Sequence, residues 1–152
     1  MTSLWLRYPT IPQSVNSIYF TRGRKRILSS EGRKFKNGFI VSRGGLPAST
    51  LMKFEADPNA AYVLEMWFFL PQEKLYNKTF GQRDGVARFK KMDVSNLIKL
   101  AEDAISELLG IPDQNNFTVI AHKRVADEGE RTALVARVST LNLEEDPYVK
   151  PG

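Results

Sequence analysis

The sequence predicts an α+β fold built as one domain, and three observations lead to this prediction. Strand-like segments come first, a long apolar strand lies in the middle, and one strongly periodic helix precedes two further strands. The length of 152 residues is typical of one domain with its own core. A hydrophobic content of 42% with 11% aromatic residues is well above that of disordered chains, so most of the chain should fold.

The first expected elements are a strand and a hairpin. Residues 4–8 alternate apolar and polar side chains, which favours a strand that ends before Pro9. Residues 16–20 and 26–28 flank the basic turn Arg22-Gly23-Arg24. This pattern predicts two short strands joined by a hairpin with a basic tip.

A helix and a central strand are expected next. Ser29 or Ser30 is a suitable N-cap for a helix that runs to about Ser42, and the segment 44–47 contains two glycines and a proline that stop it. Residues 61–70 are almost continuously apolar and rich in strand-forming side chains. We therefore expect this segment at the centre of a sheet.

The second half should contain a long basic loop, a helix and a closing hairpin. Residues 71–91 lack clear periodicity, and a loop of that length inside a domain is functional or disordered. The helix is indicated by apolar residues at helical spacing and by its stop signals Gly110 and Pro112. Residues 117–126 and 131–140 then flank a short acidic and glycine-containing turn, which predicts a hairpin. The apolar helical positions are Leu97, Ala101, Ala104, Ile105 and Leu108.

The charge distribution favours a polyanionic partner. The formal charge is +5, from 22 basic and 17 acidic residues, and the basic residues gather in residues 21–36 and 71–91. Neutralised phosphates with released counterions supply the general part of nucleic-acid affinity. Solvated surface loops explain such charge runs about equally well. The acidic end of the chain, residues 144–152, is expected to be a tail outside a domain of residues 1–143.

Composition also excludes several classes. The chain has no cysteine, which rules out disulfides, thiolate zinc sites and cysteine nucleophiles and suits a reducing compartment. Polar residues and prolines interrupt residues 1–20, so we expect no signal peptide, and no apolar run reaches the length of a membrane span. A cytoplasmic protein without a membrane partner is the expectation.

The polar side of the predicted helix carries the candidate chemistry. At about 100° per residue, Asn96, Lys99 and Asp103 share one side of the helix, opposite its apolar stripe. Asp93 precedes the helix and Asp113 follows it, so these two meet only if the flanking segments fold back. Carboxylates that hold Mg²⁺ and a lysine that neutralises phosphate charge are what a metal-assisted phosphodiesterase needs.

Each of these residues also has a structural explanation. Ser95 is a good N-cap, Lys99 and Asp103 form an i,i+4 pair, and Asp113 suits a turn after Pro112. His122, the only histidine, is expected to be structural or on the surface. The aromatic residues Trp67, Phe68 and Phe69 are expected in the core, whereas Tyr19 and Phe20 beside the basic hairpin are weaker candidates for base stacking.

The order of these motifs resembles the RusA family of Holliday junction resolvases over nearly the whole chain. Pro9-Thr10-Ile11-Pro12-Gln13-Ser14-Val15-Asn16 is similar to the family's proline-rich start that leads to an asparagine. Arg22-Gly23-Arg24 and residues 29–36 resemble its basic hairpin and the helix that follows. Asp93-Val94-Ser95-Asn96-Leu97-Ile98-Lys99 resembles the family motif Asp-x-Asp-Asn-x-x-Lys, and Asp103, Gly110 and Asp113 keep the family's spacing.

The resemblance implies a homodimer that binds four-way DNA junctions and cuts them symmetrically with Mg²⁺, for which Mn²⁺ could substitute. It implies that Asp93 and Asp113 hold the metal, that Lys99 assists at the phosphate, and that Ser95, Asn96, Asp103 and Gln114 support the site or position the substrate. The residues expected to bind DNA are Asn16, Arg22, Arg24, Lys25, Arg26, Arg33, Lys34, Arg88, Lys90 and Lys91.

Two acidic positions of the family pattern are replaced here. Ser95 stands where the motif has its second aspartate, and Gln114 stands where the second of two paired aspartates is expected to be catalytic. Weaker metal binding is the minimum consequence, although Mg²⁺ often binds through one or two carboxylates plus waters and substrate phosphates.

The sequence thus predicts an α+β domain with a mixed sheet and two main helices. The resemblance implies the expected function, which is that of a structure-selective endonuclease for four-way DNA junctions, and it suits a bacterial or phage-infected cell. Two alternatives stay open: a RusA-like protein that binds branched DNA with weak or no cleavage, and a basic module that binds an acidic protein.

Overall fold

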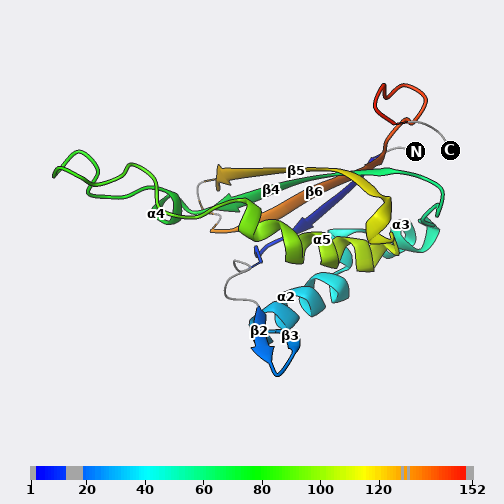
Figure 1. Cartoon of the computed structure of the whole chain (residues 1–152), viewed down its shortest axis with the longest axis horizontal. Helices are drawn as coiled ribbons and strands as arrows, with labels where there is room; N and C mark the ends of the chain where they lie inside the picture. Colours follow the sequence, from blue (N-terminus) through cyan, green and yellow to red (C-terminus); the bar gives the residue numbers. More distant parts are fainter. Residues whose placement is uncertain (1–2, 13–18, 128, 130, 150–152) are drawn as a thin grey trace.

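Strand β4 (Tyr62–Leu70) lies in the interior of a four-stranded sheet (Figure 1). Helices cover one face of this sheet, the covered face, and leave the other, the open face, uncovered. Burial alternates along this strand, because successive side chains of a strand point to opposite faces of the sheet. The side chains on the covered face are at most 2% exposed, and they are Tyr62, Leu64, Met66, Phe68 and Leu70.

The sheet is mixed, as predicted. Strand β5 (Asn116–Val125) runs parallel to β4, whereas β6 (Ala133–Thr140) is antiparallel both to β4 and to β1 (Leu4–Tyr8). The strand order is β1-β6-β4-β5. With its helices on one side of this sheet, the chain is a single small α+β domain. This computed structural model describes residues 3–12, 19–127, 129 and 131–149.

The predicted closing hairpin is wrong. Strands β5 and β6 follow each other in the sequence, but β4 lies between them and pairs with both along almost its full length. The turn residues around Gly129 suit a hairpin. However, an interior position for β4 buries the most apolar segment of the chain and pairs both of its backbone edges, which outweighs the local turn signal.

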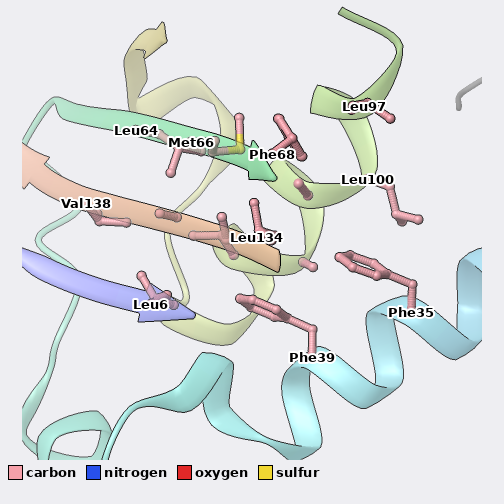
Figure 2. Packing of buried hydrophobic residues seen from close by; sticks show 14 of the residues in the cluster. Leu6, Phe35, Phe39, Leu64, Met66, Phe68, Leu97, Leu100, Leu134 and Val138 are labelled. Atoms are coloured by element: carbon pink, nitrogen blue, oxygen red, sulfur yellow. The ribbon is translucent and has the colours of Figure 1, made fainter. Parts of the chain in front are cut away.

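Two main helices pack against the sheet, as expected, and both lie on the same face of it. Ser29 is the N-cap of helix α2 (Ser30–Val41), and its Oγ accepts a hydrogen bond from the Gly32 amide at 3.2 Å. Helix α5 (Ser95–Leu109) ends at Gly110, which adopts the left-handed conformation at φ 68°. Figure 2 shows Phe35 and Phe39 extending from α2 toward the sheet and α5, where they join the common core.

The prediction that Ser95 caps α5 is wrong. Val94 occupies the N-cap position, but its backbone is already helical at φ −59° and ψ −33°. An N-cap side chain reaches the first amides only from an extended backbone. The chain instead enters α5 through a turn in which the Asp93 carbonyl accepts the Asn96 amide at 3.0 Å, and Ser95 becomes the first helical residue, exposed to solvent.

The basic hairpin is present at the start of α2. Strands β2 (Tyr19–Arg22) and β3 (Lys25–Leu28) pair antiparallel and form a separate two-stranded sheet. Gly23 has φ +66°, the left-handed value that a tight hairpin turn requires and that glycine adopts without strain. The hairpin projects away from the main sheet (Figure 1).

Short helical segments connect these elements, and the sequence did not predict them. They are η1 (Arg43–Gly45), α3 (Ala48–Lys53), α4 (Gln72–Leu75) and η2 (Asp113–Asn115). Among the described residues, none of the helices combines the length and the apolar character needed to cross a membrane.

The aromatic residues of β4 divide between the two faces. Phe68 lies in the core, as predicted, but Trp67 and Phe69 lie on the open face and are only partly buried. The prediction placed all three in the core because their segment is apolar throughout. The alternation of a strand that has helices on one side only overrides that average.

Candidate functional site

Three of the predicted site residues line one cleft of about 620 Å³ beside the C-terminal half of α5. Lys99 and Asp103 lie one helical turn apart on the same side of α5, with 3.6 Å between the Lys99 Nζ and an Asp103 carboxylate oxygen. Asp113 of η2 lines the same cleft. The remaining lining residues are Lys36, Ser106, Glu107, Gly110, Ile111 and Pro112.

The end of α5 determines where Asp113 lies. After the left-handed Gly110, the Ile111 amide donates to the Ser106 carbonyl at 2.9 Å, which turns the chain back toward the helix. The Asn116 side-chain amide then donates to Ser106 Oγ at 3.1 Å. Because both contacts return to the same turn of α5, Asp113 is held beside the polar side of the helix.

Asn115 fixes the other side of this turn. Its side chain is 7% exposed, and its amide donates to the carbonyl oxygens of Pro58 at 3.0 Å and Ala60 at 2.8 Å. A buried amide with two partners resists displacement, because breaking either bond leaves a buried polar group unsatisfied. The backbone that carries Asp113 is thus attached to both α5 and the segment before β4.

The cleft contains two lysines and three carboxylates. Lys36 of α2 forms an ion pair with Glu107, and Lys99 pairs with Asp103. Asp113 is exposed and, within the described part of the chain, forms no ion pair. The Lys99–Asp103 pair is long and partly exposed, so it contributes little to stability and a phosphate can compete for the lysine.

Asp93 does not share this cleft. It lies two residues before α5, whereas Asp113 lies four residues after the end of that helix. A helix of 15 residues is about 22 Å long at 1.5 Å per residue. Asp93 and Asp113 of one chain therefore flank opposite ends of α5. In the part of the chain that the structure describes, no group of three or more His, Asp or Glu side chains could hold a metal.

The positions of the supporting residues are also defined. Ser95 is exposed at the first turn of α5, near Asp93, and Asn96 is partly buried beside it. Gln114 is exposed in η2, next to Asp113. The two replaced acidic positions thus lie at the two different ends of α5, each beside one of the two predicted metal ligands.

The long basic loop forms an arm that extends beyond the sheet (Figure 1). After α4, the basic arm (residues 76–91) leaves and returns through paired backbone: the Asn77 amide donates to the Arg88 carbonyl at 3.0 Å, and the Lys90 amide donates to the Leu75 carbonyl at 2.9 Å. The Asn77 side-chain amide donates to the Ala87 carbonyl at 2.6 Å. These bonds give the base of the arm a defined shape, with Asp93 two residues after its end.

The predicted DNA-binding residues gather on the arm and the hairpin. Arg24 is exposed at the tip of the hairpin, and Arg33 and Lys34 are exposed on the first turns of α2. On the arm, Arg88, Lys90 and Lys91 are exposed, with the Lys90 Nζ donating to the carbonyl of Glu73. Asn16 and the side chains of Arg22, Lys25 and Arg26 lie outside the described residues.

The open face of the sheet carries a cluster that sequence reasoning missed. Glu65 accepts hydrogen bonds from Arg137 at 2.8 Å and from His122 Nε2 at 2.7 Å. Trp67 stacks on His122 with 5.1 Å between ring centroids and on Trp5 with 5.8 Å. These side chains come from all four strands, so only the register of the sheet brings them together. His122 therefore has the structural role that was one of its two predicted placements.

Comparison with known proteins does not assign the chain to a family. No protein-family model matches the chain, and no curated protein is significantly similar to it. The resemblance to the RusA family stays a prediction from the motifs quoted above.

Proposed function

We propose that this protein binds branched DNA, four-way junctions above all, and cuts it as a structure-selective, Mg²⁺-dependent endonuclease. The observation that supports this most is the convergence of Lys99, Asp103 and Asp113 on one cleft. The resemblance assigns all three to the region of the scissile phosphate. The helical period already placed Lys99 and Asp103 on one surface, but the sequence spacing did not require Asp113 to join them. A lysine beside a carboxylate that is open to solvent is a combination that phosphodiester hydrolysis uses.

The basic surfaces support DNA as the substrate. The basic arm carries five basic residues against the single acid Asp84, and the start of α2 adds the exposed Arg33 and Lys34. Their positive charge can neutralise phosphates along the DNA backbone, and the arm and the hairpin project from different parts of the molecule (Figure 1). The arm residues are Lys78, Arg83, Arg88, Lys90 and Lys91.

The separation of the two predicted metal ligands supports a homodimer. Asp93 precedes α5 and Asp113 follows it, and Asp93 does not line the cleft that contains Lys99 and Asp113. A two-fold dimer allows one protomer to supply Asp93 and its partner to supply the cleft with Lys99 and Asp113. A dimer with two such sites would be expected to cut two strands of a junction at symmetric positions.

The residues present fit Mg²⁺ through few protein ligands. Asp113 offers an exposed carboxylate, and Mg²⁺ commonly binds through one or two carboxylates with waters and substrate phosphates. When bound, the metal would activate a water and stabilise negative charge on the phosphate. Asp113 and Asp93 would hold it, Lys99 would neutralise the phosphate, and Asp103 would keep Lys99 oriented in the absence of DNA. The expected setting is the reducing cytoplasm of a bacterial or phage-infected cell.

A second candidate function is junction binding without cleavage. It is favoured by Ser95 and Gln114, which remove one carboxylate at each end of α5, and by the ion pairs that already engage Asp103 and Glu107. In this case, the basic surfaces would bind the junction and Asp93→Asn would leave binding unchanged or slightly tighter, because the change removes a negative charge near the DNA.

Cleavage by matched variants separates these two functions. Asp113→Asn and Lys99→Ala should each reduce Mg²⁺-dependent nicking of an end-labelled four-way junction by at least about a hundredfold, since each removes a charge at the reacting phosphate. Asp127→Asn, an exposed acid outside the cleft, is the control and should cut like the wild type. Equal nicking by Asp113→Asn and the wild type would rule out the cleft as the active site.

A further inference from the structure

Two phenylalanines of the basic arm are largely exposed and are held together by an arginine. Phe80 is 52% exposed and Phe89 is 56% exposed. The Arg88 guanidinium carbon lies 6.0 Å from the centroid of the Phe80 ring and 5.4 Å from that of Phe89. The centroids of the Phe89 and Tyr76 rings lie 5.4 Å apart, and the two ring planes are tilted by 58°. The arm therefore presents aromatic surface and positive charge at one place.

The fold of the arm does not account for these exposed rings. Backbone hydrogen bonds and the Asn77 side chain already close its base, and neither ring belongs to the core of the domain. Full burial of a phenylalanine side chain stabilises a fold, and both rings lose part of this stabilisation because they are exposed. Exposed aromatic rings that gather on a projecting segment are typical of a binding surface.

The chemistry of the surroundings indicates which ligand would cover the rings. A positively charged surface with aromatic rings binds nucleic acid by holding phosphates while bases stack on the rings, and the arginine adds a cation–π contribution. Phe80 also lines a hollow of about 510 Å³, together with Gln72, Glu73, Tyr76, Asn77 and Lys78. This hollow offers hydrogen-bonding groups beside the ring, where the edge of a base could lie.

We propose that Phe80, Arg88 and Phe89 form a stacking site for unpaired or unstacked nucleobases. The base faces of a continuous duplex are covered by their neighbours, whereas the branch point of a junction interrupts that stacking. An apolar side chain inserted at such a step replaces the lost contact. The inference rests on the proposed function, because the site would direct the arm to the branch point rather than to any stretch of phosphate backbone.

Ring-specific variants test the stacking site. Phe80→Leu keeps an apolar side chain but removes the aromatic ring, Phe80→Trp keeps a ring, and Phe117→Leu changes a 55% exposed phenylalanine on β5 outside the arm. Binding is measured by anisotropy on a four-way junction, a linear duplex and a single-stranded oligonucleotide. 2-Aminopurine at the branch point or within the single strand reports stacking by its fluorescence, and far-UV circular dichroism checks each fold.

The stacking site predicts that Phe80→Leu weakens binding to the junction and to the single strand by about tenfold, which lies within the range for base–aromatic stacking. Binding to the linear duplex should stay unchanged, and Phe80→Trp and Phe117→Leu should retain both the affinity and the fluorescence change. Equal binding and equal fluorescence for Phe80→Leu and the wild type would overturn the inference.

The same binding measurements distinguish an error in the proposed function from an error in the stacking site. If the wild type binds junction and duplex equally while Phe80→Leu still loses affinity for the single strand, junction recognition is refuted and base stacking stands. If the wild type selects the junction and Phe80→Leu does so equally, stacking is refuted and junction recognition stands. Absence of binding to all three DNAs at low salt would refute both.

Discussion

Removal of one charge from the basic arm should change the salt dependence of junction binding by a defined amount. Each phosphate neutralised by a protein cation contributes about 0.9 to the slope of log affinity against log salt concentration. Five arm residues in contact with phosphates would give a slope of about −4.5, and so a loss of affinity of about 500-fold between 50 and 200 mM salt. Arg83→Ala should reduce the slope by about 0.9.

Fluorescence anisotropy of a labelled junction at several salt concentrations measures this slope. The wild type and Arg83→Ala should differ more at 50 mM than at 200 mM, and the ratio of their affinities should fall by about 3.5-fold over that range. Lys53→Ala, which removes an exposed lysine from α3 on the body of the domain, is the matched control and should keep the wild-type slope. A wild-type slope below about 1, or no change in Arg83→Ala, would refute phosphate binding by the arm.

Three further predictions concern the cleft and the two ends of α5. Gly110→Ala should lower the free energy of unfolding by about 1–2 kcal/mol in urea denaturation, because φ is +68° while the added Cβ meets no atom within 4 Å; a loss above about 4 kcal/mol would contradict this. An equal mixture of inactive Asp93→Asn and Asp113→Asn chains should regain about a quarter of wild-type nicking if each site combines both protomers of a two-fold dimer, and none if each chain has its own site. Ser95→Asp combined with Gln114→Asp should lower the Mg²⁺ concentration that gives half-maximal nicking, and an unchanged metal titration would argue against metal binding at these positions.

Local signals in the sequence predicted the main helices and the basic hairpin. Ser29 caps α2 through its own side chain, Gly110 ends α5 in the left-handed conformation, and Gly23 forms the hairpin turn. In each case one residue type satisfies a requirement of the backbone within a few positions of itself. Such local requirements of the backbone do not depend on tertiary contacts, so they can be predicted from the sequence alone.

Strand pairing depends on contacts that no local signal encodes. The sequence of residues 126–132 is typical of a hairpin turn, yet β4 lies between β5 and β6, because β4 gains most from an interior position. The open-face cluster of Glu65, His122 and Arg137 has the same cause, since its members become neighbours only in this strand order. Trp67 was misplaced because the sequence does not tell that helices cover one face of the sheet only.

The candidate site was predicted in part. Sequence reasoning placed Lys99 and Asp103 on one side of a helix, which follows from the helical period. It could not place Asp113, because the return of the chain depends on the turn after Gly110 and on the buried side chain of Asn115. Asp93 and Asp113 flank opposite ends of α5, and the cleft contains Asp113 but not Asp93.

The most direct test of junction cleavage is incubation of the purified wild-type protein with an end-labelled four-way junction, with and without Mg²⁺, on native and denaturing gels. We expect a complex that forms on the junction in preference to a linear duplex, together with paired nicks at symmetric positions that appear only when the metal is present. A shifted complex without nicks in either Mg²⁺ or Mn²⁺ would contradict the nuclease and leave a protein that binds branched DNA without cutting it.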